Sequence, residues 1–235
     1  MATHMMMAMA NAVPGREKEF EDWYSSRHVH EMMQAPGIVS AQCFVLTDLQ
    51  RYKGTQPFRY MALYEIEGEE VRATIDYLIS HAGTAISGCA AMASEPQIRE
   101  LFFYPITPRR TKPLPDDGTE PEIRNVLAAM TNAVDGREDE FNDWYTNRHL
   151  PDVVKAPDIL AAQRFVLDDQ QRYAGPYFFK YLAIYEITAD SVGGVIDYIS
   201  QFLGTPAMPS SDALSVKEPR ARGAYFRPLT HRFKR

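Results

Sequence analysis

The sequence predicts an α+β fold built from two ferredoxin-like units that bury the free faces of their sheets against each other. Three observations support this prediction. The chain contains an internal repeat, each copy shows the element order β-α-β-β-α-β, and the central strands are apolar on both faces. With 235 residues, 45% of them hydrophobic, the chain is long enough to bury a substantial core.

The internal repeat appears at an offset of 121 residues. Asn11–Phe20 matches Asn132–Phe141, and 26 of the 44 positions from 11 to 54 are identical in the second copy. A second matching block aligns Tyr60–Ile66 with Tyr181–Ile187. We therefore infer that the chain arose by duplication of one unit of about 100 residues, within the usual size range of a domain.

The repeat implies a two-domain organisation with a short connection. We expect a first ferredoxin-like repeat over residues 1–110, a linker over 111–122 and a second repeat over 123–235. The segment from Pro108 to Pro121 is rich in proline and charged residues, which is typical of an extended linker rather than a packed element.

Within each copy, an apolar run ends at a Pro-Gly or Asp-Gly turn signal and leads directly into an amphipathic helix. In the first copy, Phe20, Trp23 and Tyr24 recur at helical spacing, and Ala35-Pro36-Gly37 ends the pattern. The predicted order in the first copy is a strand at 5–13, a helix at 16–34, strands at 38–46 and 58–66, a helix at 69–80 and a strand at 98–104; in the second copy the first strand is 126–134.

A βαββαβ unit places both helices on one face of an antiparallel sheet, so the other face needs a partner. In Tyr60–Ile66 and Tyr181–Ile187 both faces of the strand are mostly apolar, as expected for strands buried on two sides. Packing one sheet against the other would satisfy both copies. The predicted architecture is an intramolecular dimeric α/β barrel.

Composition excludes several function classes. The formal net charge of −6 and the pI near 5.5 argue against nucleic acid as a partner, because such binding needs clustered lysine and arginine. The Met5–Met9 run is too short to span a bilayer and lacks the pattern of a signal peptide. Cys43 and Cys89 have no counterparts in the second copy, so no disulfide framework is indicated. We expect a cytoplasmic protein that binds neither membrane nor nucleic acid.

The second copy carries a longer pattern, from Gly136 through Trp144-Tyr145 to Arg148-His149-Leu150-Pro151-Asp152, followed by Ala156-Pro157 and Ala162-Gln163-Arg164-Phe165. This pattern resembles the EthD-like group of the dimeric α/β-barrel superfamily. The resemblance implies a pocket in each half, between the first helix and the sheet. It also implies cofactor-independent chemistry on small, often aromatic molecules. The first copy departs from the pattern, because His30 replaces Pro151 and Gly37 replaces Asp158.

His28 and His149 are the strongest candidates for catalysis. Each follows a tyrosine of the buried helix face, Tyr24 or Tyr145, by four residues, so it should point toward the sheet. An imidazole there is expected to titrate near neutrality and to act as a general acid or base. The structural alternative is a histidine that caps helix carbonyls or packs against Trp23 or Trp144.

Other polar and aromatic residues have a binding interpretation and a structural one. The tyrosines of the third strand could donate to an oxyanion or belong to the core. The arginine before each histidine could bind a carboxylate or pair with Glu31 or Asp152, and Glu65 and Glu186 are most simply ion-paired. The proposed catalytic set is His149, His28, Tyr185 and Tyr64, and the proposed substrate-binding set is Asn11, Asn132, Trp23, Trp144, Tyr24, Tyr145, Arg27, Arg148, Gln42 and Gln163.

Three functions remain open at this point. The first is a cofactor-independent lyase or isomerase, such as a dehydratase or cyclase, that acts on a small hydrophobic carbonyl or aromatic compound. The second is a cofactor-free oxygenase of a phenolic substrate, and the third is a non-catalytic binding or accessory protein. We expect no metal and no cofactor, although haem binding occurs elsewhere in the superfamily. Exposed second helices would support a homodimer of the fused barrel.

Overall fold

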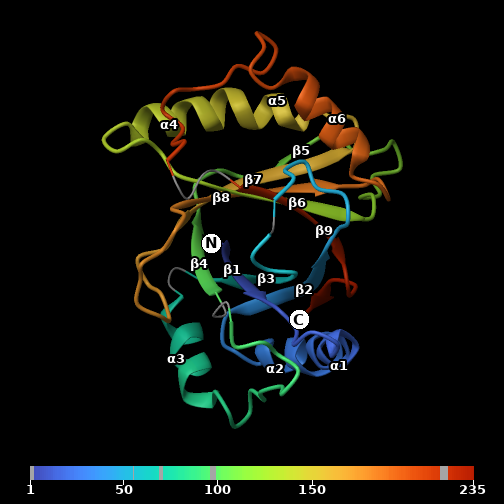
Figure 1. The fold of residues 1–235 in the computed structure, drawn as a ribbon, viewed down its shortest axis with the longest axis vertical. Helices are drawn as coiled ribbons and strands as arrows, with labels where there is room; N and C mark the ends of the chain where they lie inside the picture. Colours follow the sequence, from blue (N-terminus) through green and yellow to red (C-terminus); the bar gives the residue numbers. More distant parts are fainter. Residues whose placement is uncertain (1–2, 55, 69–70, 96–98, 218–221) are drawn as a thin grey trace.

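The computed structural model describes residues 3–54, 56–68, 71–95, 99–217 and 222–235. In these ranges eight strands form one closed antiparallel barrel, which lies between two layers of helices (Figure 1). The barrel order is β2-β3-β1-β4-β7-β8-β6-β9, and β9 pairs with β2 to close it. The strands are β1 (Thr3–Ala10), β2 (Ile38–Leu46), β3 (Tyr60–Glu67), β4 (Arg99–Pro105), β6 (Asn125–Thr131), β7 (Ile159–Leu167), β8 (Tyr181–Ile187) and β9 (Arg222–Pro228).

Each half carries two helical segments on the outer face of its four strands. The first is a continuous helix whose middle turn is π-helical, and this turn ends at the histidine of the motif in both halves. The described part of the predicted helix at 69–80 is helical from Arg72, whereas Glu69 and Glu70 lie outside the described residues. The segments are α1 (Glu17–Trp23), the π-helical turn Tyr24–His28, α2 (Val29–Met32) and α3 (Arg72–His81), then α4 (Glu138–Trp144), the π-helical turn Tyr145–His149, α5 (Leu150–Val154) and α6 (Gly193–Phe202).

The strands separate two kinds of core. In β1, Met5, Met7 and Met9 pack inside the barrel, whereas Met6 and Ala8 pack against the helices of the first half. This alternation follows from the two-residue period of a strand. It explains why the residues on both faces of the strand are apolar. Burial on two faces therefore makes the barrel the shared core, with one further core under each helical layer.

The two halves meet through hydrogen-bonded strand edges. β4 pairs with β7 from Phe103–Leu167 to Pro105–Phe165, and β2 pairs with β9 from Phe44–Pro228 to Leu46–Phe226. The predicted fold class, an α+β dimeric α/β barrel, is confirmed. The two sheets were expected to pack face to face, whereas in the structure their edges join to form one continuous barrel. Closure removes four strand edges whose unpaired N–H and C=O groups would otherwise need water.

The segment predicted as an unpacked linker is partly packed. Its strand β5 (Arg110–Thr111) pairs with Ala161 and Ala162 of β7, and the Lys112 ammonium donates to the Ala156 carbonyl at 2.5 Å. The C-terminal strand β10 (Phe233–Lys234) makes the equivalent pairing with β2. This packing is limited to the start of the segment, where β5 pairs with the part of the β7 edge that β4 does not cover. Composition does not reveal this pairing.

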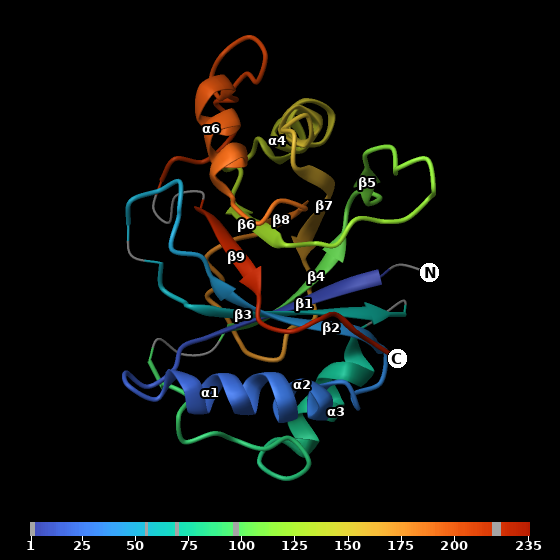
Figure 2. The same ribbon diagram turned by 90° about the vertical axis from the view of Figure 1, so that its right-hand side faces the viewer.

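The strand carboxylates are ion-paired, as the simpler interpretation of the sequence held. Glu186 pairs with Arg109, and Glu65 pairs with Arg232. Each arginine follows the last strand of the opposite half, so these ion pairs also tie the halves together. Figure 2 shows the segment after β9 running along β2 to the C-terminus. No helix within the described ranges is long and apolar enough to cross a bilayer.

Candidate functional site

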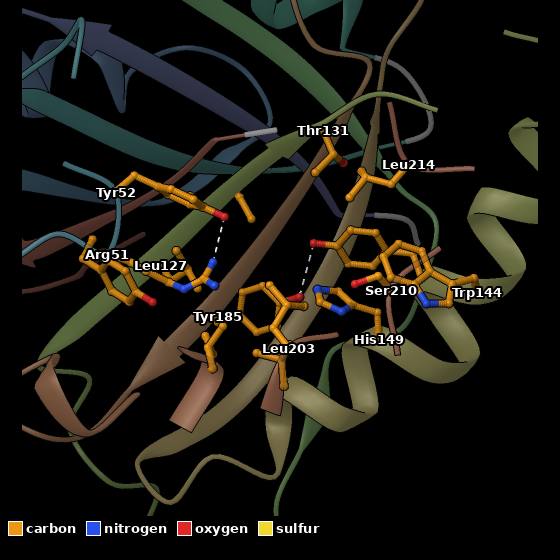
Figure 3. A pocket seen from close by; sticks show the side chains of 16 residues that line it. Arg51, Tyr52, Leu127, Thr131, Trp144, His149, Tyr185, Leu203, Ser210 and Leu214 are labelled. Atoms are coloured by element: carbon orange, nitrogen blue, oxygen red, sulfur yellow. Dashed lines mark hydrogen bonds between the residues drawn. The ribbon is translucent and has the colours of Figure 1, made fainter. Parts of the chain in front are cut away.

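A cavity of about 150 Å³ lies in the second half, between the helical layer and the outer face of the barrel (Figure 3). Its floor is formed by side chains of β6, β8 and β9, and its roof comes from the helices. A loop of the first half supplies part of the rim. The lining residues are Arg51, Tyr52, Leu127, Ala129, Thr131, Trp144, Tyr145, His149, Val153, Tyr185, Ile199, Leu203, Ser210, Leu214, Gly223 and Tyr225.

His149 lines this cavity from the end of the π-helical turn. Its ring stacks on Trp144 at a centroid distance of 4.8 Å and meets Tyr145 edge-on at 4.8 Å. Its Nδ1 atom is buried without a hydrogen-bond partner in the described part of the chain. A π-helical turn inserts one residue into a helix and so changes which side chains face the sheet, and such turns are frequent at functional sites.

Burial decides the charge state of this histidine. Desolvation lowers the pKa of His149 to about 4, against a smaller opposing effect of Asp152, and Arg164 and Arg51 lower it further. The expectation that the imidazole titrates near neutrality was therefore wrong. At neutral pH the ring is uncharged, so it can act as a base and accept a proton. It cannot act as an imidazolium acid.

Two tyrosine hydroxyls lie beside the imidazole. The Tyr185 hydroxyl donates to the Tyr145 hydroxyl at 3.3 Å, and both residues line the cavity. Burial raises the pKa of Tyr185 well above its usual value, and the neighbouring Tyr145 adds to this effect. The pair therefore stays protonated, and because the Tyr185 O–H is donated to Tyr145, the Tyr145 O–H is the one free to donate to a developing oxyanion in the cavity.

The rim residues Arg51 and Tyr52 were missed as site residues. They belong to the loop between β2 and β3 of the first half, which reaches across to the second half in Figure 1. Gln50 holds the loop in place, because its amide donates to the Tyr225 carbonyl at 2.8 Å and accepts from the Tyr225 N–H at 2.9 Å. The recurrence of Arg-Tyr at Arg172-Tyr173 was the available signal, but the sequence did not show that each loop crosses to the other half.

Arg164 is a second residue that the sequence analysis did not select. It is 1% exposed, and its guanidinium stacks over the Tyr145 ring at 4.3 Å. It donates to the Thr146 hydroxyl at 2.6 Å and to the Asn142 side-chain oxygen at 2.9 Å. The sequence did contain a signal for this residue, because an arginine stands within an apolar strand where the first copy has Cys43. Arg164 supports the helix behind the cavity and is not among the lining residues.

The first half places His28, Tyr24 and Tyr64 in the corresponding positions. His28 stacks on Trp23 at 4.4 Å, and burial lowers its pKa to about 4. The Nδ1 atom of His28 and the hydroxyls of Tyr24 and Tyr64 are buried and have no hydrogen-bond partner among the described residues. The near-neutral titration expected for His28 is corrected for the same reason as for His149.

The asparagines predicted to bind substrate have a structural role. The Asn11 amide donates to the Pro57 carbonyl at 2.7 Å, and its oxygen accepts from the Arg59 N–H at 2.7 Å. Asn132 makes the same two bonds to Phe178 and Lys180, at 2.7 and 2.8 Å. Both amides are engaged by the backbone that leads into the third strand of their half, which agrees with the structural interpretation of these residues.

The glutamines and arginines of the motif also lie away from the cavity lining. Gln42 donates to the Thr230 carbonyl and Gln163 to the Thr107 carbonyl, each at 3.0 Å. Arg27 pairs with Glu31 at 2.8 Å, and Arg148 pairs with Asp152 at 3.1 Å. Intramolecular partners already engage these polar groups, which agrees with the structural interpretation of the four residues.

Both tryptophans have their indole N–H groups bonded. Trp23 donates to the Ser87 hydroxyl at 3.1 Å, and Trp144 donates to the Pro209 carbonyl at 3.0 Å. Trp144 therefore offers the cavity its ring face rather than a donor. A haem is far larger than the cavity beside Trp144, so the residues present do not fit that group. The described residues contain no cluster of three or more metal-ligating side chains.

Comparisons with known proteins establish the fold. No family model matches the chain, and no curated protein matches it. An anthrone oxidase-like protein of known structure is 13% identical, with a TM-score of 0.60 over 99% of this chain and 93% of that chain. A chlorite dismutase from Candidatus Nitrospira defluvii is 10% identical, with a TM-score of 0.53 over 97% and 92%. A regulator of staphylococcal pathogenesis is 9% identical, with a TM-score of 0.51 over 97% and 99%.

These structures define the class of the protein as a dimeric α/β barrel with a closed antiparallel barrel of eight strands. The three neighbours differ in the activities that their names describe, and all three have low sequence identity. The likeness therefore concerns the fold, and the reaction has to be argued from the cavity.

Proposed function

We propose that this protein is a cofactor-independent enzyme that removes a proton from a small aromatic or carbonyl compound in the cavity of the second half. The observation that carries this proposal is the buried, uncharged His149 imidazole beside the Tyr185–Tyr145 hydroxyl pair. A base and an oxyanion donor that share a largely apolar cavity form the arrangement that enolisation or elimination requires.

The chemistry divides between these groups as follows. The His149 imidazole accepts a proton from carbon or oxygen of the substrate, and the electron pair that remains moves to a carbonyl or phenolic oxygen. The Tyr145 hydroxyl donates a hydrogen bond to that oxygen, while the Tyr185 hydroxyl donates to the Tyr145 oxygen. An imidazole with a pKa of about 4 is a weak base before reaction, but the anion formed next to it stabilises the imidazolium and raises its pKa. Return of the proton at another atom gives isomerisation, and loss of a leaving group gives elimination.

A cofactor-free oxygenase is the second candidate, and it begins with the same proton abstraction. The carbanion of an activated CH₂ group reduces dioxygen, one oxygen atom becomes the carbonyl oxygen, and the other leaves as water. The balance is CH₂ plus O₂ to C=O plus H₂O, with no further reductant. The anthrone oxidase-like neighbour makes this candidate worth testing. Oxygen consumption that matches substrate loss would favour it over a lyase or isomerase.

The variant His149→Ala tests the proposed base directly. We expect turnover to fall by about 10²- to 10⁴-fold, which is the usual contribution of a positioned general base. The matched control is His28→Ala, which removes the equivalent ring from the first half and should leave most of the turnover. Melting temperatures for both variants separate loss of the base from loss of folding. Full activity in His149→Ala, or ligand binding without any turnover in the native protein, would contradict the proposal.

The pH profile provides a second test of the same group. Because the free enzyme carries its base in the active form above a pKa of about 4, we expect kcat/KM to rise from pH 3.5 and to be level from about pH 6 to 8. Short assays after dilution from pH 7 would limit the effect of acid unfolding. A profile that still rises between pH 6 and 8 would indicate a base other than His149.

We also propose that the chain is an EthD-like protein formed by tandem duplication, with repeats at 1–110 and 123–235. The matching histidines, tryptophans and tyrosines of the two leading helices support this proposal. We further propose a cytoplasmic location, because Cys43 and Cys89 are both free thiols, and association of the barrel into a homodimer. Size-exclusion chromatography with light scattering tests the last point.

A further inference from the structure

One difference between the two halves lies where β4 and β9 face their helical layers. In β4, Glu100 pairs with Ala8 of β1, and in β9 the same place beside Ala129 of β6 is occupied by Gly223. Gly223 lines the cavity of the second half. The barrel therefore presents a carboxylate under the first helical layer and a bare backbone under the second.

In the first half, the Glu100 carboxylate forms an ion pair with Arg172 at 2.6 Å, and both side chains are 12% exposed. Glu100 also acts electrostatically on the buried Tyr24 and Tyr64, the counterparts of the cavity tyrosines Tyr145 and Tyr185. Arg172 lies on the loop of the second half that reaches across to the first half. The first half thus contains its own carboxylate, which pairs with the arginine of the crossing loop.

In the second half, the equivalent arginine has no such partner within the described ranges. Arg51 matches Arg172 in the repeat, lines the cavity, and donates to the Tyr52 hydroxyl at 2.7 Å and the Ser200 hydroxyl at 3.3 Å. No carboxylate of the described residues forms an ion pair with it, although guanidinium groups favour bidentate pairing with carboxylates. Arg51 is therefore a cation at the rim of an apolar cavity. Its counterpart in the first half of the barrel, Arg172, is already neutralised by Glu100.

We propose that the cavity of the second half binds a small aromatic carboxylate, whose carboxylate pairs with Arg51 in the way that Glu100 pairs with Arg172. The ring of the ligand lies between Leu127 and Trp144, beside His149 and Tyr185. This inference names the substrate class of the proposed enzyme and rests on that proposed function. A cavity of about 150 Å³ is large enough for a benzene-sized ring, which sets the size of the ligand near one ring.

The proposal also predicts how the cavity can be closed. A Cβ atom added at Gly223 would lie 3.1 Å from the Leu127 Cδ1 atom, the flexible end of a side chain. The backbone at Gly223 is not in the left-handed region. A Cβ atom at this position therefore requires only a small shift of the Leu127 side chain. We expect a glutamate there to place a carboxylate beside Arg51, as the first half does with Glu100 and Arg172.

Isothermal titration calorimetry with salicylate and its neutral analogue salicylamide tests the proposal on the full chain at pH 7. We expect salicylate to bind more tightly than salicylamide. Arg51→Met should weaken salicylate by about tenfold or more, consistent with loss of a charge-assisted pair, and leave salicylamide within twofold. Gly223→Glu should abolish salicylate binding, whereas Gly223→Ala should retain it. Arg72→Met, at an exposed arginine of α3, is the matched control.

Failure of this inference is distinguishable from failure of the proposed function. Equal affinity for the two probes, no detectable binding of salicylate, or an unchanged affinity in Arg51→Met would overturn the anion site. His149→Ala removes the base but leaves Arg51 in place, so it should keep salicylate binding while turnover is lost. If salicylate binds more tightly than salicylamide but His149→Ala keeps full turnover, the proposed role of His149 as the base is contradicted. The proposed anion-binding site at Arg51 is then still supported. Circular dichroism of each variant checks that it is folded.

Discussion

Acidification from pH 7 to pH 4 is expected to lower the free energy of unfolding by several kcal/mol, with His28 and His149 as the main cause. Burial lowers the pKa of both rings from 6.5 to about 4 in the folded state. Since the unfolded chain binds these protons near pH 6.5 and the folded chain does so only near pH 4, protonation favours unfolding in between. Stability is complete above about pH 6.5 and is lost as the pH falls toward 4.

The expected loss is about 3 kcal/mol for each histidine, from 1.36 kcal/mol per pKa unit. Urea unfolding followed by tryptophan fluorescence at pH 7, 5.5 and 4.5 would measure it. The double variant His28→Asn and His149→Asn should lose most of the pH dependence in this window. His231→Asn, at an exposed histidine, serves as the control. The same pH dependence in the double variant as in the native chain would show that the two rings are not the cause.

The second large effect is expected from Glu100→Ala. The carboxylate of Glu100 neutralises the nearly buried Arg172 at 2.6 Å, and its removal leaves that cation without a carboxylate partner. Breaking one side of a buried ion pair typically costs about 3 to 5 kcal/mol, because the remaining charge stays desolvated. Both side chains retain some exposure, so we expect a decrease of about 3 kcal/mol in the free energy of unfolding at pH 7.

Chemical denaturation at pH 7 would measure this difference. Asp76→Ala is the matched control, because Asp76 pairs with Arg72 on the exposed face of α3 and should contribute less than about 0.5 kcal/mol. The double variant Glu100→Ala and Arg172→Met should recover part of the loss, and the double-mutant cycle gives the coupling energy of the pair. A loss for Glu100→Ala no larger than that for Asp76→Ala would mean that Arg172 finds water or another partner.

Much of the fold could be predicted because its signals are local. The strand predicted at Ile38–Leu46 has those bounds in the structure, and the turn signals before the leading helices coincide with Gly15 and Gly136, whose φ angles are +83° and +77°. The apolar helix face and the two-sided strands also followed from the spacing of residues. The π-helical turns did not, because their sequence differs little from that of an ordinary helix.

The candidate site was predicted only in part. His149, Trp144, Tyr145 and Tyr185 do line one cavity, as their shared helix face and strand position indicated. The motif asparagines, glutamines and arginines looked equally suitable, but backbone carbonyls and carboxylates satisfy them in the folded chain. Hydrogen-bond satisfaction depends on neighbours far apart in the sequence, so residue type alone could not separate ligand-binding groups from structural ones.

The sequence by itself determined the repeated βαββαβ order, the burial of both strand faces and the placement of an aromatic helix with one histidine over each half of the barrel. These features depend on periodicity and composition, which are local properties of the chain. Only the tertiary structure decided the charge of His149, the arrival of Arg51 from the opposite half and the difference between Glu100 and Gly223. Each of these depends on desolvation or on contacts between segments that only the closed barrel brings together.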